Sequence, residues 1–140
     1  IGVTLGSEAC EAALETYGGI KRIALVTPYM PVGDENVRRY FTDVGYEVVR
    51  IKGLKCASPQ LIAHVSREEL RDAVIEVNGD DVDAIVQAGT NLAMAEVAAM
   101  AEFWLGKPVL AINAVTYWYA LRQSGIRDTV TGYGRLLAEH

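Results

Sequence analysis

The sequence predicts an α/β fold in which a four-stranded parallel sheet is covered by helices on both faces. Short apolar runs alternate along the chain with longer segments whose apolar residues recur every three or four positions. The runs are rich in Val, Ile, Leu and Ala without polar alternation, as expected for strands that are buried on both faces. A helix-length segment separates successive runs, which is the connection that parallel strands require.

The first half of the chain is expected to supply two strands. A helix is predicted over 7–17, where Gly18-Gly19 stops it. A strand follows over 22–27. The next segment, 36–44, carries apolar residues at the i, i+3, i+4, i+7 positions of a helix. A second strand is expected over 47–52, near an edge of the sheet because charged residues flank its apolar ones.

The second half is expected to supply the other two strands. Residues 53–65 are expected to form a loop with a turn at Pro59. Ser66 and Glu69 form a capping box, which predicts a helix that ends near Asn78-Gly79. The remaining elements alternate again: a strand over 84–88, a helix over 92–105, a strand over 109–112, and helices over 115–123 and 135–139.

Three turns are expected at the carboxyl ends of strands, where open parallel sheets bind their ligands. They are Thr27-Pro28-Tyr29, Gly89-Thr90-Asn91 and the segment 113–116, which begins with Asn113. All three carry hydrogen-bond donors without net charge, which favours a small carboxylate or another oxyanion. Gly89 lets a ligand approach the backbone closely, and a helix beginning at Leu92 is expected to aim free N–H groups and a partial positive charge at it.

Composition narrows the class of protein. The 140 residues suffice for a single domain, 1–140, and the formal net charge is −5 with scattered basic residues, which disfavours nucleic-acid binding. No apolar run approaches the ~20 residues that span a bilayer, and no signal peptide is evident. Cys10 and Cys56 are far apart and fit no metal-binding pattern. We therefore expect a cytoplasmic protein with reduced thiols, no cysteine-based metal site and no membrane partner.

Several other residues are interpreted without a chemical role. Cys10 is expected in the core, Cys56 in a loop as an idle thiol, and His64 at the surface or as a cap. The cluster Tyr117-Trp118-Tyr119 is expected to pack, within the domain or against a partner subunit of a homo-oligomer. Gly132-Tyr133-Gly134 lacks the third glycine of a dinucleotide fingerprint and follows no strand, so it is set aside.

Four stretches resemble the later half of the maleate cis-trans isomerase and arylmalonate decarboxylase branch of the aspartate/glutamate racemase superfamily. The stretches are 21–29, 88–92, 106–113 and 132–137. The resemblance implies a fold of two similar α/β halves, with a cofactor-independent active site between them. This chain, which opens without Met, would be one half, and residues 1–5 would be the tail of a missing first lobe.

The resemblance also implies a reaction on a small carboxylic or dicarboxylic acid that passes through an enediolate. Tyr29, Thr90 and Asn91 would hold carboxylate oxygens, and Gly89 would supply room and a backbone donor. Asn113 would either orient the ligand or close its own turn. Neutral donors of this kind lower the barrier by stabilising negative charge as it builds up on the substrate.

Gly89 departs from the pattern, because the family usually has a cysteine there. Glycine cannot move a proton or attack carbon, so decarboxylation or another reaction with a single thiol is favoured over racemisation or isomerisation with two. Members that decarboxylate arylmalonates keep the thiol on this side, so the chain departs from them too. The resemblance then implies a catalytic thiol upstream of Ile1. Two alternatives remain: a non-catalytic module that binds carboxylates, and a structural α/β domain without a ligand.

Overall fold

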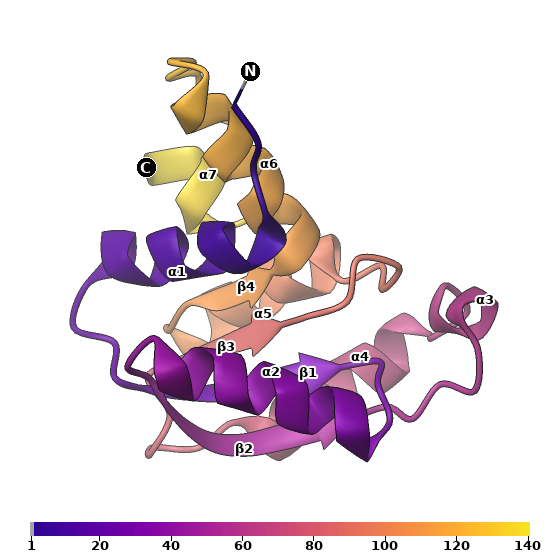
Figure 1. The fold of residues 1–140 in the computed structure, drawn as a ribbon. Coiled ribbons are helices and arrows are strands. Elements are labelled where there is room, and N and C mark those ends of the chain that lie inside the picture. The colour runs from indigo at the N-terminus through magenta and orange to yellow at the C-terminus, as the bar shows by residue number, and fades with distance from the viewer. Residues whose placement is uncertain (1) are drawn as a thin grey trace.

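The computed structural model describes residues 2–140, which contain a four-stranded sheet in the order β2-β1-β3-β4 (Figure 1). All three neighbouring pairs are parallel, which confirms the predicted sheet. The chain crosses from β1 to β2 on one side and then continues to β3 on the other side of β1. The winding therefore reverses between β1 and β3. The strands are β1 (Arg22–Thr27), β2 (Glu47–Gly53), β3 (Ala84–Gln87) and β4 (Val109–Ala111).

Helices cover both faces of the sheet, as predicted (Figure 1). One face, here called the front, carries α1 (Gly6–Tyr17), α2 (Pro31–Asp43), α6 (Ile112–Gln123) and α7 (Arg135–Glu139). The back carries α4 (Arg67–Val77) and α5 (Ala95–Leu105). A short helix, α3 (Pro59–Ile62), lies in the loop after β2, where the sequence predicts a turn. Among residues 2–140 no helix has the length and apolarity to cross a membrane.

Each face of the sheet has its own apolar core, because successive side chains of a strand point to opposite faces. In β1, Ile23 and Leu25 join the front core, whereas Ala24 and Val26 join the back core. All four side chains are fully buried. This explains why the strand has an uninterrupted apolar run instead of a polar alternation.

Local sequence patterns correctly predicted the bounds of β1 and the start of α4. β1 has the predicted bounds, and the capping box before α4 is formed. The Glu69 N–H donates to Ser66 Oγ at 3.1 Å, and the Ser66 N–H donates to Glu69 Oε2 at 2.9 Å. These bonds hold the pKa of the Glu69 carboxyl below its usual value, because they favour its charged form.

Three helix starts were predicted wrongly. α2 begins at Pro31 instead of residue 36, because proline is well suited to the first position of a helix. α5 begins at Ala95 instead of Leu92. Leu92 and Met94 are almost fully buried in the back core, but they belong to a turn and not to the helix. The sequence analysis therefore mistook the apolar residues of this turn for the first turn of the helix.

The third error removes a predicted turn. Residues 113–116 belong to α6, which begins directly after β4. The buried Gln87 side chain explains the abrupt end of the strand, because its Oε1 accepts the Ile112 N–H at 3.3 Å. That bond replaces the next rung of the strand ladder. Asn113 therefore lies in the first turn of a helix.

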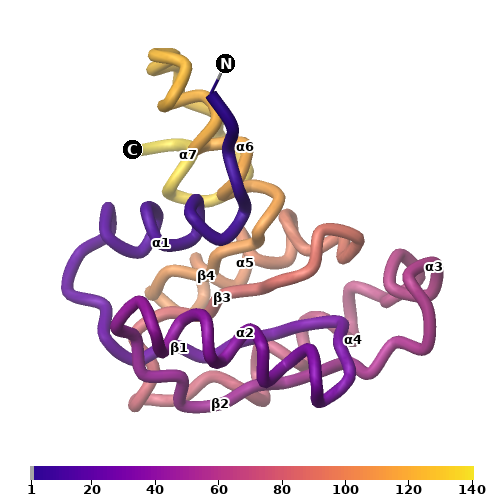
Figure 2. The backbone as a smooth tube through the Cα atoms, viewed as in Figure 1, coloured from indigo at the N-terminus to yellow at the C-terminus, as the bar shows by residue number. Residues whose placement is uncertain are grey.

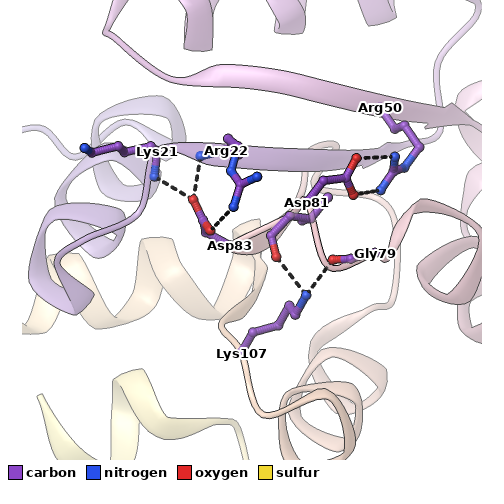
Figure 3. A network of polar contacts seen from close by, with 8 residues as sticks. Lys21, Arg22, Arg50, Gly79, Asp81, Asp83 and Lys107 are labelled. Carbon is purple, nitrogen blue, oxygen red and sulfur yellow. Dashed lines mark hydrogen bonds and ion pairs between the residues drawn. The ribbon is translucent and has the colours of Figure 1, made fainter.

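Ion pairs and backbone contacts close the amino end of the sheet (Figure 3). Asp83 Oδ2 accepts the N–H groups of Lys21 and Arg22 at 3.1 and 2.9 Å, and Oδ1 accepts the Arg22 guanidinium at 3.3 Å. These backbone bonds first, and then the guanidinium, lower the pKa of the Asp83 carboxyl. Lys107 Nζ donates to the carbonyls of Gly79 and Val82 at 2.9 and 2.7 Å. These contacts join the starts of β1, β3 and β4.

Candidate active site

The loops after β1, β2 and β3 gather at the carboxyl edge of the sheet (Figure 2). Tyr29 follows β1 and Gly89 follows β3, and these two strands are direct neighbours. The winding of the chain reverses between them. Ligands of open α/β sheets bind at such a topological switch point, because the loops there diverge and leave a crevice.

An open hollow of about 430 Å³ lies beside this point. Its size is in the range of small-molecule sites. α1, α2 and the end of β3 enclose it. Its polar lining comes from Ser7, Cys10, Tyr29, Asn36 and Tyr40, and its apolar lining includes Val37, Phe41, Val86 and Ile112.

Gly89 is buried at the edge of this hollow with a backbone that only glycine adopts readily. Its φ is +96°, and a Cβ built there would lie 2.6 Å from both Cγ and Cδ of Pro28. The same Cβ would be 3.7 Å from the Tyr29 hydroxyl oxygen. A cysteine at this position would therefore be strained and would press on the Pro28 ring. The absence of a thiol here is built into the local backbone.

Tyr29 is held firmly although its side chain is partly exposed. A Cβ at Gly33 would lie 2.6 Å from Tyr29 Cβ, so the aromatic side chain packs directly on the α2 backbone. The Tyr29 N–H donates to Thr27 Oγ1 at 3.1 Å, and the fully buried Thr27 hydroxyl donates to the Asp34 carboxylate. The Tyr29 carbonyl accepts the Lys55 N–H at 3.2 Å. These contacts fix the residue beside Gly89.

Free donors collect in the turn after β3. Among residues 2–140, the N–H groups of Gly89, Thr90 and Asn91 donate to no protein acceptor, and neither does the Tyr29 hydroxyl. The carbonyls of Gly89 and Thr90 are occupied: Gly89 accepts from Gln87 Nε2 at 2.8 Å and from the Leu92 N–H at 3.3 Å, and Thr90 accepts from Asn113 Nδ2 at 2.9 Å. These bonds hold the turn in place and leave its three N–H groups available, which suits an anion.

The structure places the predicted site residues in two groups. Tyr29 and Gly89 line the hollow. Thr90, Asn91 and Asn113 are exposed, and Thr90 and Asn113 follow directly after the lining residues Gly89 and Ile112. Asn113 Nδ2 donates to the Thr90 carbonyl at 2.9 Å, so this side chain braces the turn.

The expected helix N-terminus is not at this turn. α5 begins at Ala95, with Met94 as its N-cap, and residues 90–93 separate it from Gly89. The first-turn amides and the dipole of α5 therefore do not begin at Thr90, as the sequence suggested. The N–H groups of the turn itself remain as the donors for an anion.

Four polar residues of the hollow were missed by the sequence analysis or given no site role. Ser7 and Cys10 come from α1, and Asn36 and Tyr40 come from α2. Cys10 is buried, as predicted, and burial raises its pKa to about 12, so it is a neutral thiol near pH 7. Burial also raises the pKa of Tyr40, whose hydroxyl donates to Glu11 Oε2 at 3.3 Å. Only the three-dimensional placement of α1 and α2 shows that these residues line the same hollow.

The other candidate residues lie outside this hollow. Cys56 is partly buried, and its N–H donates to the Pro28 carbonyl at 3.0 Å. His64 is exposed. Trp118 is buried in the front core, whereas Tyr117 is 55% exposed, so the aromatic cluster packs only in part. Over residues 2–140, no group of three or more His, Cys, Asp or Glu side chains could hold a metal ion.

The geometry first defines a class: a doubly wound α/β domain that offers neutral donors at its switch point, as a small anionic ligand requires. Comparison with known proteins makes this specific. The chain belongs to the arylmalonate decarboxylase family, whose model matches residues 2–137.

Curated and solved relatives agree with this assignment. The maleate isomerase of Alcaligenes faecalis is 27% identical over 121 residues, which are 86% of this chain and 48% of that enzyme. The crystal structure of the maleate isomerase Iso from Pseudomonas putida S16 superposes with a TM-score of 0.88 at 30% identity, over 96% of this chain and 54% of that one. The chain spans about half the length of the curated relatives that it matches.

A third relative carries chemical information. The maleate cis-trans isomerase of Nocardia farcinica has been solved as a cysteine-to-serine variant with a covalently bound succinylcysteine intermediate. It superposes with a TM-score of 0.85 at 27% identity, over 96% of this chain and 53% of that one. The racemase-like fold expected from the sequence is therefore confirmed.

Proposed function

We propose that this chain forms one side of the active site of a cofactor-independent isomerase or decarboxylase that acts on a small carboxylic or dicarboxylic acid. One observation carries the proposal: the Tyr29 hydroxyl lies beside the Gly89 turn, where three consecutive N–H groups lack protein partners among residues 2–140. Family membership and the maleate isomerase relatives support it. The relatives are enzymes, so the non-catalytic binding module has no support among them.

The donors match the charge that such a reaction develops. Removal of CO2 or a proton next to a carboxylate leaves an enediolate, and addition of a thiolate to an unsaturated diacid gives a similar anion. The Tyr29 hydroxyl and the N–H groups of Gly89, Thr90 and Asn91 would bind the carboxylate oxygens as that charge grows. Loss of one such donor typically lowers kcat by about 10²–10³-fold. Asn113 would act through the Thr90 carbonyl as a positioning residue.

The catalytic thiol is assigned outside these 140 residues. Gly89 cannot supply it, and the backbone there rejects a side chain. Cys10 lines the hollow, but its raised pKa keeps it protonated and poorly nucleophilic. The succinylcysteine in the Nocardia farcinica relative shows that a cysteine forms a covalent intermediate in that enzyme. We therefore favour a reaction with one thiol, such as decarboxylation, over isomerisation that requires two.

Binding to the 140-residue chain tests the donor site directly. Titration calorimetry with malonate, maleate and an arylmalonate should detect binding of at least one, and Tyr29→Phe should weaken it about 10- to 100-fold, the loss expected for a hydrogen bond to a charged group. Tyr117→Phe removes a hydroxyl from an exposed tyrosine of α6 that does not line the hollow, and should leave affinity unchanged. No binding by any of the acids, or equal affinity of the Tyr29 variant, would contradict the proposal.

Turnover tests the position of the thiol separately. The 140-residue chain alone should bind acids without releasing CO2 from malonates or fumarate from maleate. Turnover by this chain that disappears on thiol alkylation would mean that Cys10 or Cys56 is the catalytic group. That result would overturn the assignment of the thiol while leaving the donor site intact.

A further inference from the structure

The two central strands of the sheet each end in a buried polar residue. Thr27 ends β1 and Gln87 ends β3, and they are 0% and 1% exposed. Such residues call for an explanation, because burying a polar group costs free energy unless it is hydrogen-bonded. Thr27 holds the backbone of Tyr29, and the contacts of Gln87 point to an equivalent task in the turn after β3.

The Gln87 carboxamide bonds to the backbone at three points. Its Nε2 donates to the Ala88 carbonyl at 2.6 Å and to the Gly89 carbonyl at 2.8 Å, which uses both of its hydrogens. Its Oε1 accepts the Ile112 N–H at 3.3 Å, at the junction of β4 and α6. One uncharged side chain therefore fastens the turn after β3 to the neighbouring strand.

The carbonyls that Gln87 holds share their peptide units with two of the free donors. The Ala88 carbonyl belongs to the same unit as the Gly89 N–H, and the Gly89 carbonyl belongs to the same unit as the Thr90 N–H. A trans peptide unit is planar, so its C=O and N–H point in opposite directions, and no peptide bond within residues 2–140 is cis. Carbonyls directed at the buried Gln87 side chain therefore aim both N–H groups away from it.

Gly89 does not fix these directions by itself. Glycine adopts positive and negative φ about equally well, so the peptide units on either side of it rotate at little cost unless something holds them. The Leu92 N–H donates to the Gly89 carbonyl at 3.3 Å, which is longer than the bond from Gln87 and restrains only one of the two units. The Gln87 carboxamide contacts both.

We propose that Gln87 is a positioning residue that fixes the directions of the Gly89 and Thr90 N–H groups for the carboxylate of the substrate. Asn113 completes the set, because the Thr90 carbonyl that it holds shares its peptide unit with the Asn91 N–H. Donors that are oriented in advance need no reorganisation when charge develops on the substrate. The inference rests on the proposed function, since it takes these N–H groups to be the donors for the acid.

Residual dipolar couplings of the ligand-free 140-residue chain test the positioning, because they report the direction of each N–H bond. Gln87→Met removes the carboxamide at similar side-chain length, and the couplings of Gly89 and Thr90 should then lose their agreement with the native directions while that of Asn91 keeps it. Asn113→Ala should have the reverse effect. Unchanged couplings of Gly89 and Thr90 in Gln87→Met would overturn the inference, whatever the chain binds.

Calorimetry with malonate tests the consequence for binding. Gln87→Met should weaken malonate binding about 10-fold, because the freed N–H groups must then be ordered when the ligand binds. Glu102→Gln is the matched control, since Glu102 is also buried, at 5% exposed, and accepts the N–H groups of Val109 and Arg135 at 3.1 and 2.7 Å. It should lower stability and leave malonate affinity unchanged. Equal affinity losses in the two variants, or none in Gln87→Met, would overturn the inference.

The side-chain amide signal of Gln87 gives a readout that needs no variant. When Gly89 and Thr90 donate to bound malonate, their peptide units become better acceptors, because linked hydrogen bonds polarise one another. The Gln87 Nε2 protons should therefore move downfield with the same affinity, while those of the exposed Gln60 and Gln123 stay in place. A Gln87 signal that stays in place while malonate shifts Gly89 and Thr90 would contradict the inference. Failure of the unchanged chain to bind any acid would contradict the proposed function, and the dipolar couplings, which need no ligand, would still decide the role of Gln87.

Discussion

The two ends of the sheet differ in how their polar groups are satisfied. At the amino end, Asp83 accepts two backbone N–H groups and a guanidinium, and Lys107 donates to two carbonyls (Figure 3). At the carboxyl end, the Tyr29 hydroxyl and the N–H groups of the Gly89 turn lack partners among residues 2–140. Of these residues Gly89 is buried, and buried polar groups are normally paired, so its free N–H is the one that most needs an acceptor from a ligand. The amino end thus stabilises the fold, and we propose that the carboxyl end binds the ligand.

The largest loss of unfolding free energy should come from adding a side chain at Gly89, where the Pro28 ring leaves no room for a Cβ. Gly89→Ala places a Cβ 2.6 Å from the Pro28 ring at a φ of +96°, and should destabilise the chain by about 3 kcal/mol in urea unfolding. Gly45 has a similar φ of +101° but nothing within 4 Å of its Cβ position, so Gly45→Ala should cost only about 1–2 kcal/mol. Equal costs for the two variants would show that Pro28 does not press on this site.

Loosening the support of Tyr29 should affect stability and binding together. Thr27→Val keeps the shape of the side chain but leaves the Tyr29 N–H and the Asp34 carboxylate without their shared hydroxyl. We expect a loss of about 2 kcal/mol in unfolding free energy and weaker diacid binding by calorimetry. Thr42→Val on the exposed side of α2 is the control and should change stability by less than about 0.5 kcal/mol. Unchanged diacid binding in Thr27→Val would contradict the claim that the Thr27 hydroxyl positions Tyr29.

At the amino end of the sheet, a substitution should lower the unfolding free energy without changing diacid affinity. Asp83→Ala removes three hydrogen bonds from a partly exposed carboxylate, and we expect a loss of about 1–2 kcal/mol after allowing for solvent screening. Diacid affinity should not change, because the residue lies at the opposite end of the sheet. A binding defect in this variant would mean that the two ends are coupled.

The capping box predicts a smaller loss. Ser66→Ala removes the acceptor of the Glu69 N–H and should cost about 1 kcal/mol in unfolding free energy. Ser58 caps the short α3 in a similar way, so Ser58→Ala is a comparison in a helix of only four residues. It should cost less, since few residues depend on that helix. A larger stability loss in Ser58→Ala than in Ser66→Ala would contradict the expectation that α4 contributes more to stability than α3.

Acid should weaken the contribution of Asp83 at the amino end of the sheet. The folded pKa of Asp83 lies below its unfolded value near 3.9, so its contribution is complete above about pH 5 and is lost as the pH falls through the folded pKa. Urea midpoints measured between pH 6 and pH 2.5 should therefore fall less steeply in Asp83→Asn than in the unchanged chain. Parallel curves would show that another carboxyl controls acid unfolding.

The sequence predicted what local chemistry decides. The bounds of β1 follow from its apolar run, and the start of α4 follows from its capping box. The location of Tyr29 and Gly89 at the carboxyl edge of the sheet follows from their places after β1 and β3. The predicted start of α5 was wrong, because apolar spacing cannot distinguish a helix from a turn whose residues enter the core, as Leu92 and Met94 do. The helices α2 and α6 begin earlier than predicted, at Pro31 and directly after β4.

Long-range packing decided the rest of the site. The switch point depends on the pairing of β1 with β3, which the predicted strands did not specify. Asn36 and Tyr40 line a hollow that has α1 as another of its walls, and their helical spacing is the same as that of core residues. The bracing of Thr90 by Asn113 likewise needs the loop after β3 and α6 to meet.

Backbone NMR with a titrated diacid tests the central claim most directly, because it observes each N–H group. On addition of malonate, the amide protons of Gly89, Thr90 and Asn91 should move downfield together and saturate with one affinity, while those of Gly45 and Gly106, which also have positive φ, should stay in place. Uncharged malonamide should cause no such shift. Shifts centred elsewhere, or none in this turn while binding is detected by calorimetry, would contradict the account.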